Sequence, residues 1–101
     1  MSIRVMVYGK VHRQEDIQAF EEAFSQVSRA VKGTAGHVHD ELLHDCENPL
    51  LFILLSEWNS REEFLRWEES PIHREVTVPI RPYWKAERER KIFDIDVRIE
   101  H

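Results

Sequence analysis

The sequence lacks the features that mark secreted and membrane proteins. It has one cysteine, Cys46, so no disulfide can form within the chain, and a free thiol is typical of a reducing compartment. Its longest apolar run, Leu50 to Leu55, is far shorter than the roughly 20 residues that a membrane-spanning helix requires. The first residues alternate in polarity at once, without the apolar stretch of a signal peptide. We therefore expect a soluble, cytoplasmic protein.

An excess of positive charge is also absent. The net charge is −5 at pH 7, and the charged segment from Lys85 to Lys91 mixes both signs, which argues against nucleic acid as a partner. No repeat or linker interrupts the 101 residues, so we expect a single domain spanning residues 1–101. A domain of this size buries a modest core and can gain stability by association with a second copy.

Two periodicities divide the chain into elements. Alternation with period two, or a short apolar run, predicts strands at Ile3 to Val11, His37 to Asp45, Leu50 to Trp58 and Ile92 to Ile99. Apolar residues at helical spacing predict a helix over Glu15 to Lys32, which ends at Gly33. A capping box formed by Ser60 and Glu63 predicts the start of a second helix, and Pro71 can open a further short turn beyond it.

This order of elements, β-α-β-β-α-β, predicts an α+β ferredoxin-like fold. In this fold a four-stranded antiparallel sheet carries both helices on one face. The segment from Leu50 to Leu55 is apolar at every position, which indicates burial on both sides of the sheet. The helices can cover only one side. We therefore expect the other face to pack against a second copy of the chain in a two-fold homodimer.

Polar and aromatic side chains gather between Ser56 and Trp84. This stretch contains three indoles, one imidazole, one phenol and a guanidinium, at Trp58, Trp67, Trp84, His73, Tyr83 and Arg81. A pocket for a flat organic molecule needs apolar walls with a few polar groups placed among them. The stretch therefore predicts a ligand site, and no metal, nucleotide or nucleophile motif competes with it.

The chain resembles the antibiotic biosynthesis monooxygenase family along nearly its whole length. The resemblance rests on the order and spacing of several short pieces. These are Gly36, Glu41-Leu42-Leu43-His44, Glu47-Asn48-Pro49, Glu57-Trp58-Asn59-Ser60 and Ser70-Pro71-x-His73. It implies a dimeric α+β barrel with a pocket between sheet and helices in each protomer. Members of this family oxygenate phenolic polyketides without metal or flavin, and others bind or degrade heme.

The resemblance also implies roles for particular residues. In the oxygenases a helix-two Trp and a Tyr six residues later line the pocket; Trp67 matches the first, and His73 stands at the second. Glu63 stands where the oxygenases have an Asn. Heme-degrading members have a His ten residues after that Trp, where this chain has Thr77, and an Asn on strand one that is missing here. The resemblance therefore implies oxygenation without a cofactor more than heme degradation.

Each candidate residue also has a purely structural interpretation. Trp58 at a strand end can cap the core, and Trp67, three residues after Phe64, can belong to the core as well as to the pocket. His73 is the best proton acceptor, because imidazole titrates near neutral pH, but it can instead be hydrogen-bonded at the helix start. Arg81 could bind a carboxylate or quinone oxygen, and Tyr83 and Trp84 could close the pocket mouth.

Three histidines raise the alternative of a metal site. His37 and His39 share one face of a regular strand, whereas His44 points to the other face unless a bulge intervenes. Because a catalytic metal needs three ligands in fixed geometry, we predict no metal. Cys46 lies in a turn without a nearby histidine and is not expected to be a nucleophile.

The sequence thus predicts a cofactor-independent monooxygenase acting on a small phenolic or polycyclic aromatic compound. His73 and Trp67 are the expected catalytic residues, and Trp58, Arg81, Tyr83 and Trp84 are expected to bind substrate. Two alternatives stay open. The first is a binding protein for heme or another planar ligand, and the second is a structural dimer whose own side chains fill the pocket.

Overall fold

The computed structural model describes residues 2–87 and 89–101. The strands are β1 (Ile3–Val11), β2 (His37–His44), β3 (Leu51–Trp58), β4 (Trp84–Ala86) and β5 (Lys91–Asp94). The helices are α1 (Ile17–Ala30), α2 (Arg61–Glu68) and α3 (Pro71–Val76), with 3-10 turns at Gln14–Asp16 and Val78–Ile80. This order confirms the predicted helices and the first three predicted strands, whereas two short strands, β4 and β5, stand where one was predicted.

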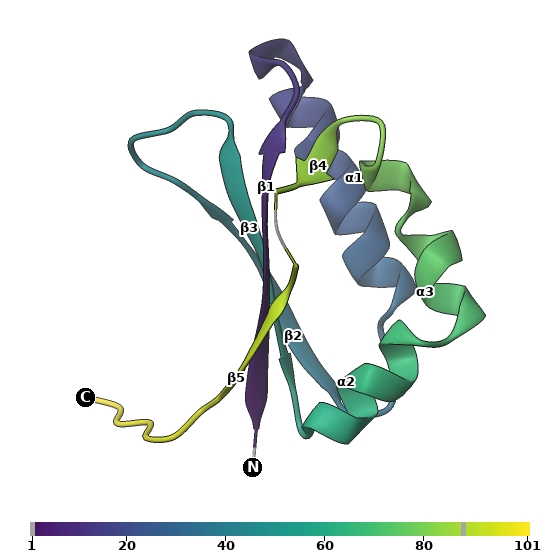
Figure 1. The fold of residues 1–101 in the computed structure, drawn as a ribbon, viewed down its shortest axis with the longest axis vertical. Helices are drawn as coiled ribbons and strands as arrows, with labels where there is room; N and C mark the ends of the chain where they lie inside the picture. The colour runs from purple at the N-terminus through teal and green to yellow at the C-terminus, as the bar shows by residue number, and fades with distance from the viewer. Residues whose placement is uncertain (1, 88) are drawn as a thin grey trace.

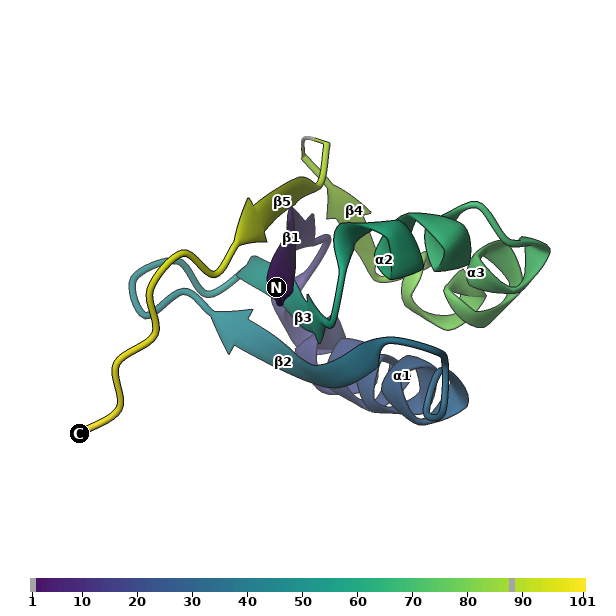
Figure 2. The ribbon, with the colours of Figure 1, turned by 90° about the horizontal axis from the view of Figure 1, so that it is seen from below.

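The strands form one antiparallel sheet in the order β2-β3-β1-β4, and β5 also pairs with β1. Figures 1 and 2 show all three helices on the same side of this sheet. The predicted α+β ferredoxin-like fold is therefore confirmed. The opposite side, which we call the open face, carries no helix.

The fourth strand differs from the prediction. Two short strands, β4 and β5, take its place along the same edge of β1. β5 ends at Asp94, whereas the alternating pattern predicted a strand through Ile99. Asp94 pairs with Ile3, the first residue of β1, and beyond it the Ile95 N–H donates to the Ser2 carbonyl at 3.0 Å. The alternating residues that follow have no β1 residue opposite them.

The connections follow the local chemistry of the chain. The Ser60 hydroxyl accepts a hydrogen bond of 3.2 Å from the Glu63 backbone N–H, which confirms the predicted start of α2. Gly36, just before β2, has a φ of +85° and lies against the Glu63 side chain. A residue with a Cβ would be strained there and would have to displace Glu63. These contacts fix the position of α2 against the start of β2.

Two groups of buried side chains join the helices to the sheet. The first contains Val11, Phe20, Ala23, Phe52, Ile80 and Trp84, and the second contains Ile3, Val5, Trp58 and Phe64. Gly9 on β1 makes the first group fit, because a Cβ at this position would overlap the Trp84 indole and the Lys85 carbonyl. Each group packs one end of the helical layer against the sheet.

The open face is only partly covered by the chain itself. Leu55 is 5% exposed, but Leu43 on β2 and Phe93 on β5 are 37% and 44% exposed. Beyond β5, Val97 and Ile99 are more exposed still.

Among the residues that the structure describes, no helix combines the length and the apolar character needed to cross a membrane.

Candidate functional site

A cavity of about 590 Å³ lies between the sheet and the helices. This volume is within the range of small-molecule sites. Its walls bring together five of the six predicted site residues: Trp58 from β3, Trp67 from α2, His73 from α3, Trp84 from β4, and Arg81 just before β4. Strands and helices far apart in sequence therefore converge on the predicted ligand site.

Aromatic rings form a continuous wall of this cavity. The ring centre of Trp67 lies 5.3 Å from that of Trp58 and 4.6 Å from that of His73. The Nε1–H groups of Trp67 and Trp84 are buried, and neither has a hydrogen-bond partner among the described residues. A ligand oxygen could accept from these donors, and a flat aromatic ligand could stack on the indoles.

His73 is the cavity residue with the clearest electrostatic signature. Its partial burial lowers the pKa of the imidazole below 6.5, because burial penalises the charged form. The negative charge of Glu68 opposes this shift, and the positive charge of Arg81 adds to it. His73 is therefore neutral at physiological pH and can accept a proton.

Folding stability is expected to fall when the pH drops from neutral to below 6.5, and His73 is one cause. The unfolded chain binds a proton at the ordinary histidine pKa, but the folded chain binds it only at lower pH. Between these values the unfolded state holds more protons, so acid favours unfolding. In urea titrations at several pH values, acid should therefore lower the free energy of unfolding less in His73→Gln than in the parent protein. Equal losses would contradict this explanation.

Arg81 and Tyr83, two predicted site residues next to β4, differ in their position relative to the cavity. Arg81 lines the cavity, and its guanidinium donates to the Thr77 hydroxyl at 3.2 Å. Tyr83 does not line the cavity; it packs against the buried group around Trp84. Its backbone carbonyl accepts a hydrogen bond from the His12 N–H, which ties the start of β4 to β1.

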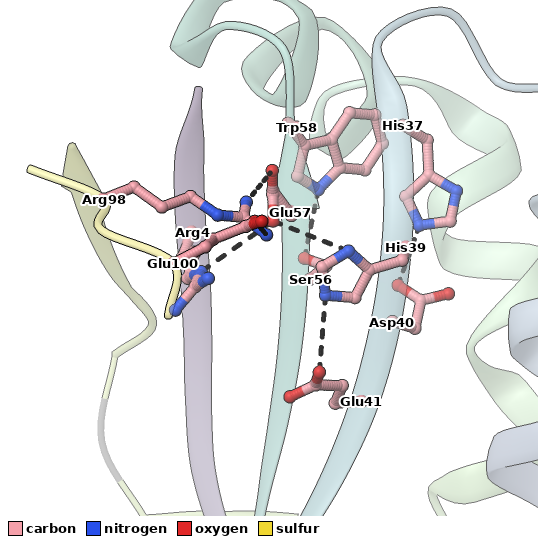
Figure 3. A network of polar contacts seen from close by, with 10 residues as sticks. All are labelled: Arg4, His37, His39, Asp40, Glu41, Ser56, Glu57, Trp58, Arg98 and Glu100. Atoms are coloured by element: carbon pink, nitrogen blue, oxygen red, sulfur yellow. Dashed lines mark hydrogen bonds and ion pairs between the residues drawn. The ribbon is translucent and has the colours of Figure 1, made fainter. Parts of the chain in front are cut away.

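Sequence reasoning did not identify a second polar group of the cavity. Ser28 from α1 and His37 and Asp40 from β2 also line it, and they contact one another. The expectation that His37 and His39 share one face was wrong. A bulge between them pairs His37 with Trp58 and His39 with Glu57, so the two histidines point to opposite faces (Figure 3).

A further pair of cavity residues was missed because its members are distant in sequence. Arg90 donates two hydrogen bonds, of 2.9 and 2.8 Å, to the carboxylate of Glu68 on α2. This bidentate contact raises the pKa of the Arg90 guanidinium and lies across 22 residues of chain. It joins the segment before β5 to the helical wall, and no short motif could have revealed it.

The described residues contain no group of three histidine, cysteine or acidic side chains placed to hold a metal ion. His44, the third histidine of β2, has its Nε2 2.8 Å from the Pro49 carbonyl and stacks on Phe52. Cys46 is exposed in the turn between β2 and β3. These side chains lie outside the cavity walls.

The sequence from residue 2 to residue 77 matches the family described as antibiotic biosynthesis monooxygenase. The chain belongs to this family. The matched region runs from β1 through α3, so it includes the cavity wall formed by Trp58, Trp67 and His73. The resemblance stated from the short sequence pieces is therefore confirmed.

Two curated Streptomyces proteins are similar to part of this family member. Protein SchA of Streptomyces halstedii is 39% identical over 62 residues, which are 61% of this chain and 16% of SchA. The 42.8 kDa protein in the whiE locus of Streptomyces coelicolor is 35% identical over 78 residues, or 77% of this chain and 19% of that protein. The matched segment is thus less than a fifth of either relative.

Solved structures of similar fold include an oxygenase and a heme degrader. SnoaB, a cofactor-independent oxygenase from Streptomyces nogalater, has a TM-score of 0.79, with 16% identity over 99% of this chain and 98% of SnoaB. MhuD, a heme degrader from Mycobacterium tuberculosis seen with two hemes in its active site, has a TM-score of 0.71, with 15% identity over 99% of this chain and 100% of MhuD. At these identities the similarity establishes the fold.

Proposed function

We propose that residues 1–101 form one domain that oxygenates a small phenolic or polycyclic aromatic compound without a cofactor. The observation that carries this proposal is the cavity itself, whose wall combines indoles with the neutral imidazole of His73. The family membership supports a monooxygenase, and the fold is shared with SnoaB, a cofactor-independent oxygenase.

In this proposal Trp67 stacks on the ring of the substrate and His73 accepts its phenolic proton. The resulting electron-rich ring gives two electrons to oxygen and forms a bond from ring carbon to oxygen. The second oxygen atom leaves as water after it takes up protons, so phenol and oxygen give quinone and water. The sheet and the helices that wall the cavity limit the access of solvent to the reactive intermediate. Arg81 could bind the developing carbonyl oxygen.

Oxygen uptake with a dihydroxynaphthalene, and no added metal or flavin, tests the proposal. We expect uptake above the rate of spontaneous oxidation, and a decrease of about 10²-fold or more in kcat for His73→Ala, because a positioned base contributes at least this much. Trp67→Ala is expected to raise KM as well. His44→Gln is the matched control, since His44 lies outside the cavity wall.

The competing candidate is binding of heme in the same cavity. It is favoured by the ring nitrogens of His73, which have no hydrogen-bond partner among the described residues and so could bind iron. Added hemin would then give a Soret band that is lost in His73→Ala. That band, together with no oxygen uptake above background, would replace the oxygenase proposal.

We also propose that two copies of the chain associate through their open faces. Leu43 and Phe93 offer exposed apolar area there, and Ile53 of β3 pairs with Leu43 on the same face. Exposed apolar surface on a sheet face is typical of a protein interface. In such a dimer each protomer keeps its own cavity on the opposite side of the sheet.

A further inference from the structure

A hydrogen-bonded group on the sheet wall of the cavity has no role in the proposed reaction. The Nε2 atom of His37 lies 2.8 Å from Oδ1 of Asp40, and the other oxygen of this carboxylate accepts a bond of 2.6 Å from the Ser28 hydroxyl. The side chains of His37 and Asp40 are 9% and 12% exposed. The two β2 residues are therefore held rigidly, with α1 supplying the third member.

The arrangement fixes which nitrogen of His37 is free. An ionised carboxylate only accepts hydrogen bonds, so Nε2 of His37 carries the hydrogen that it donates to Asp40. In the neutral form of the ring the lone pair is then on Nδ1, and no hydrogen bond to that atom is found among the described residues. A carboxylate behind one nitrogen and a free lone pair on the other is the arrangement of a general base.

The position of His37 relative to His73 suggests how a ligand would use both. The ring centre of His37 lies 4.9 Å from that of Trp58, Trp58 lies 5.3 Å from Trp67, and Trp67 lies 4.6 Å from His73. Each of these four rings lines the cavity. The two indoles thus lie between the two imidazoles in this series of ring contacts.

A purely structural role would also explain the bond between Ser28 and Asp40, because it joins α1 to β2. It would not explain why a histidine whose Nδ1 has no hydrogen-bond partner among the described residues lines the cavity. Ser28, His37 and Asp40 also line a second, surface depression beside α1, where Arg29 and Lys32 lie. The group therefore connects the cavity to the surface.

We propose that His37 is a second proton acceptor of the cavity and that the ligand is a planar aromatic with acidic hydroxyl groups at two separated edges. Asp40 and Ser28 are positioning residues, which hold the His37 ring and stabilise its charged form. This inference rests on the proposed function of the cavity as a site for aromatic compounds. One hydroxyl meets His73 at the helical wall, and the other gives its proton to Nδ1 of His37.

Two matched probes test this arrangement. 2,6-Dihydroxyanthraquinone has a hydroxyl at each end of a flat ring system, and 2-hydroxyanthraquinone has only one. Both absorb at longer wavelength when a hydroxyl loses its proton, so spectral titration at neutral pH measures affinity and proton transfer together. The proteins compared are the parent chain, His37→Gln, Asp40→Asn, His73→Gln and, as a control outside the cavity, His44→Gln.

The parent chain should bind the dihydroxy probe about tenfold more tightly than the monohydroxy probe, as one additional hydrogen bond to a charged group allows. His37→Gln and His73→Gln should each abolish this preference and reduce the long-wavelength band. Asp40→Asn should reduce the long-wavelength band of the dihydroxy probe, although the His37 ring is still present. The His44→Gln control should bind both probes as the parent chain does, because His44 lies outside the cavity wall.

Three outcomes count against these claims and separate them. An unchanged preference and band in His37→Gln, with both lost in His73→Gln, would overturn the inference and leave the proposed function standing. An Asp40→Asn variant that matches the parent would remove the positioning role. If the parent chain binds neither probe, the cavity is not a site for hydroxylated aromatics, and the proposed function fails together with the inference.

Discussion

Replacement of Trp58 by alanine should cost about 3–5 kcal/mol of unfolding free energy, in the range found for deletion of a buried large aromatic. The Trp58 side chain is 1% exposed and lies within 5.6 Å, between ring centres, of His37, Phe64 and Trp67. Its Nε1–H donates to the Ser56 hydroxyl at 3.0 Å. Loss of the Trp58 indole would therefore remove the ring contacts with His37, Phe64 and Trp67.

Urea denaturation followed by circular dichroism measures this cost. Trp58→Phe is the matched control, because it keeps an aromatic ring and should lose much less than Trp58→Ala. If Trp58→Ala lowers the free energy of unfolding by less than about 1 kcal/mol, the Trp58 indole does not stabilise the core as proposed. The sequence left open whether Trp58 caps the core or lines the cavity, and in the structure its single indole does both.

The second large effect concerns the open face. Phe93→Asp is expected to convert a dimer to a monomer of 12.1 kDa at micromolar concentration, because it places a charge in the proposed apolar interface. The register places Phe93 opposite Arg4, and Arg4 opposite Glu57, so these side chains share the open face. Sedimentation velocity measures the change, and fluorescence of the indoles checks that the variant is folded.

The matched control is Ile72→Asp on α3. Ile72 is 58% exposed, more than Phe93, but it lies in the helical layer on the other side of the sheet. This variant should sediment like the parent chain. A parent chain that sediments only as a 12.1 kDa species at micromolar concentration would overturn the proposed dimer.

The open face also carries a buried carboxylate. Glu57 is 4% exposed, and it lies 3.5–3.9 Å from nitrogen atoms of Arg4, His39 and Arg98 (Figure 3). Its Oε1 atom nevertheless has no hydrogen-bond partner among the described residues. Buried charges are normally both paired and hydrogen-bonded. The open face therefore has unmet polar contacts beside its apolar ones, which favours an interface with mixed chemistry.

The fold could be predicted largely because its signals are local. The Ser60 hydroxyl caps the start of α2 by a bond to a residue three positions later. The alternation in β1 likewise depends on residues that are adjacent in sequence. The end of β5 could not be predicted, since Ile95 to Ile99 alternate as well as the preceding residues do. Whether an alternating segment becomes a strand depends on a partner edge, and β1 offers none past Ile3.

The candidate site divides in the same way. The presence of Trp67 and His73 in one cavity wall could be predicted because they lie six positions apart in one segment that carries the family resemblance. The pairing of His37 with Asp40 could not, because it depends on a bulge that turns His37 toward the cavity. An unbulged strand would place His37 and His39 together and leave the cavity without the imidazole of His37.

By itself the sequence determined the class of the fold and the segment that supplies the aromatic wall, through periodicity and residues close together in the chain. The family followed from the resemblance of its short pieces to known members. Only the tertiary structure decided which side chains share the cavity. Ser28, Asp40, Glu68 and Arg90 come from four separate segments, and their contacts depend on strand register and helix placement. Such contacts form between surfaces that meet only when the chain has folded, so no local pattern can specify them.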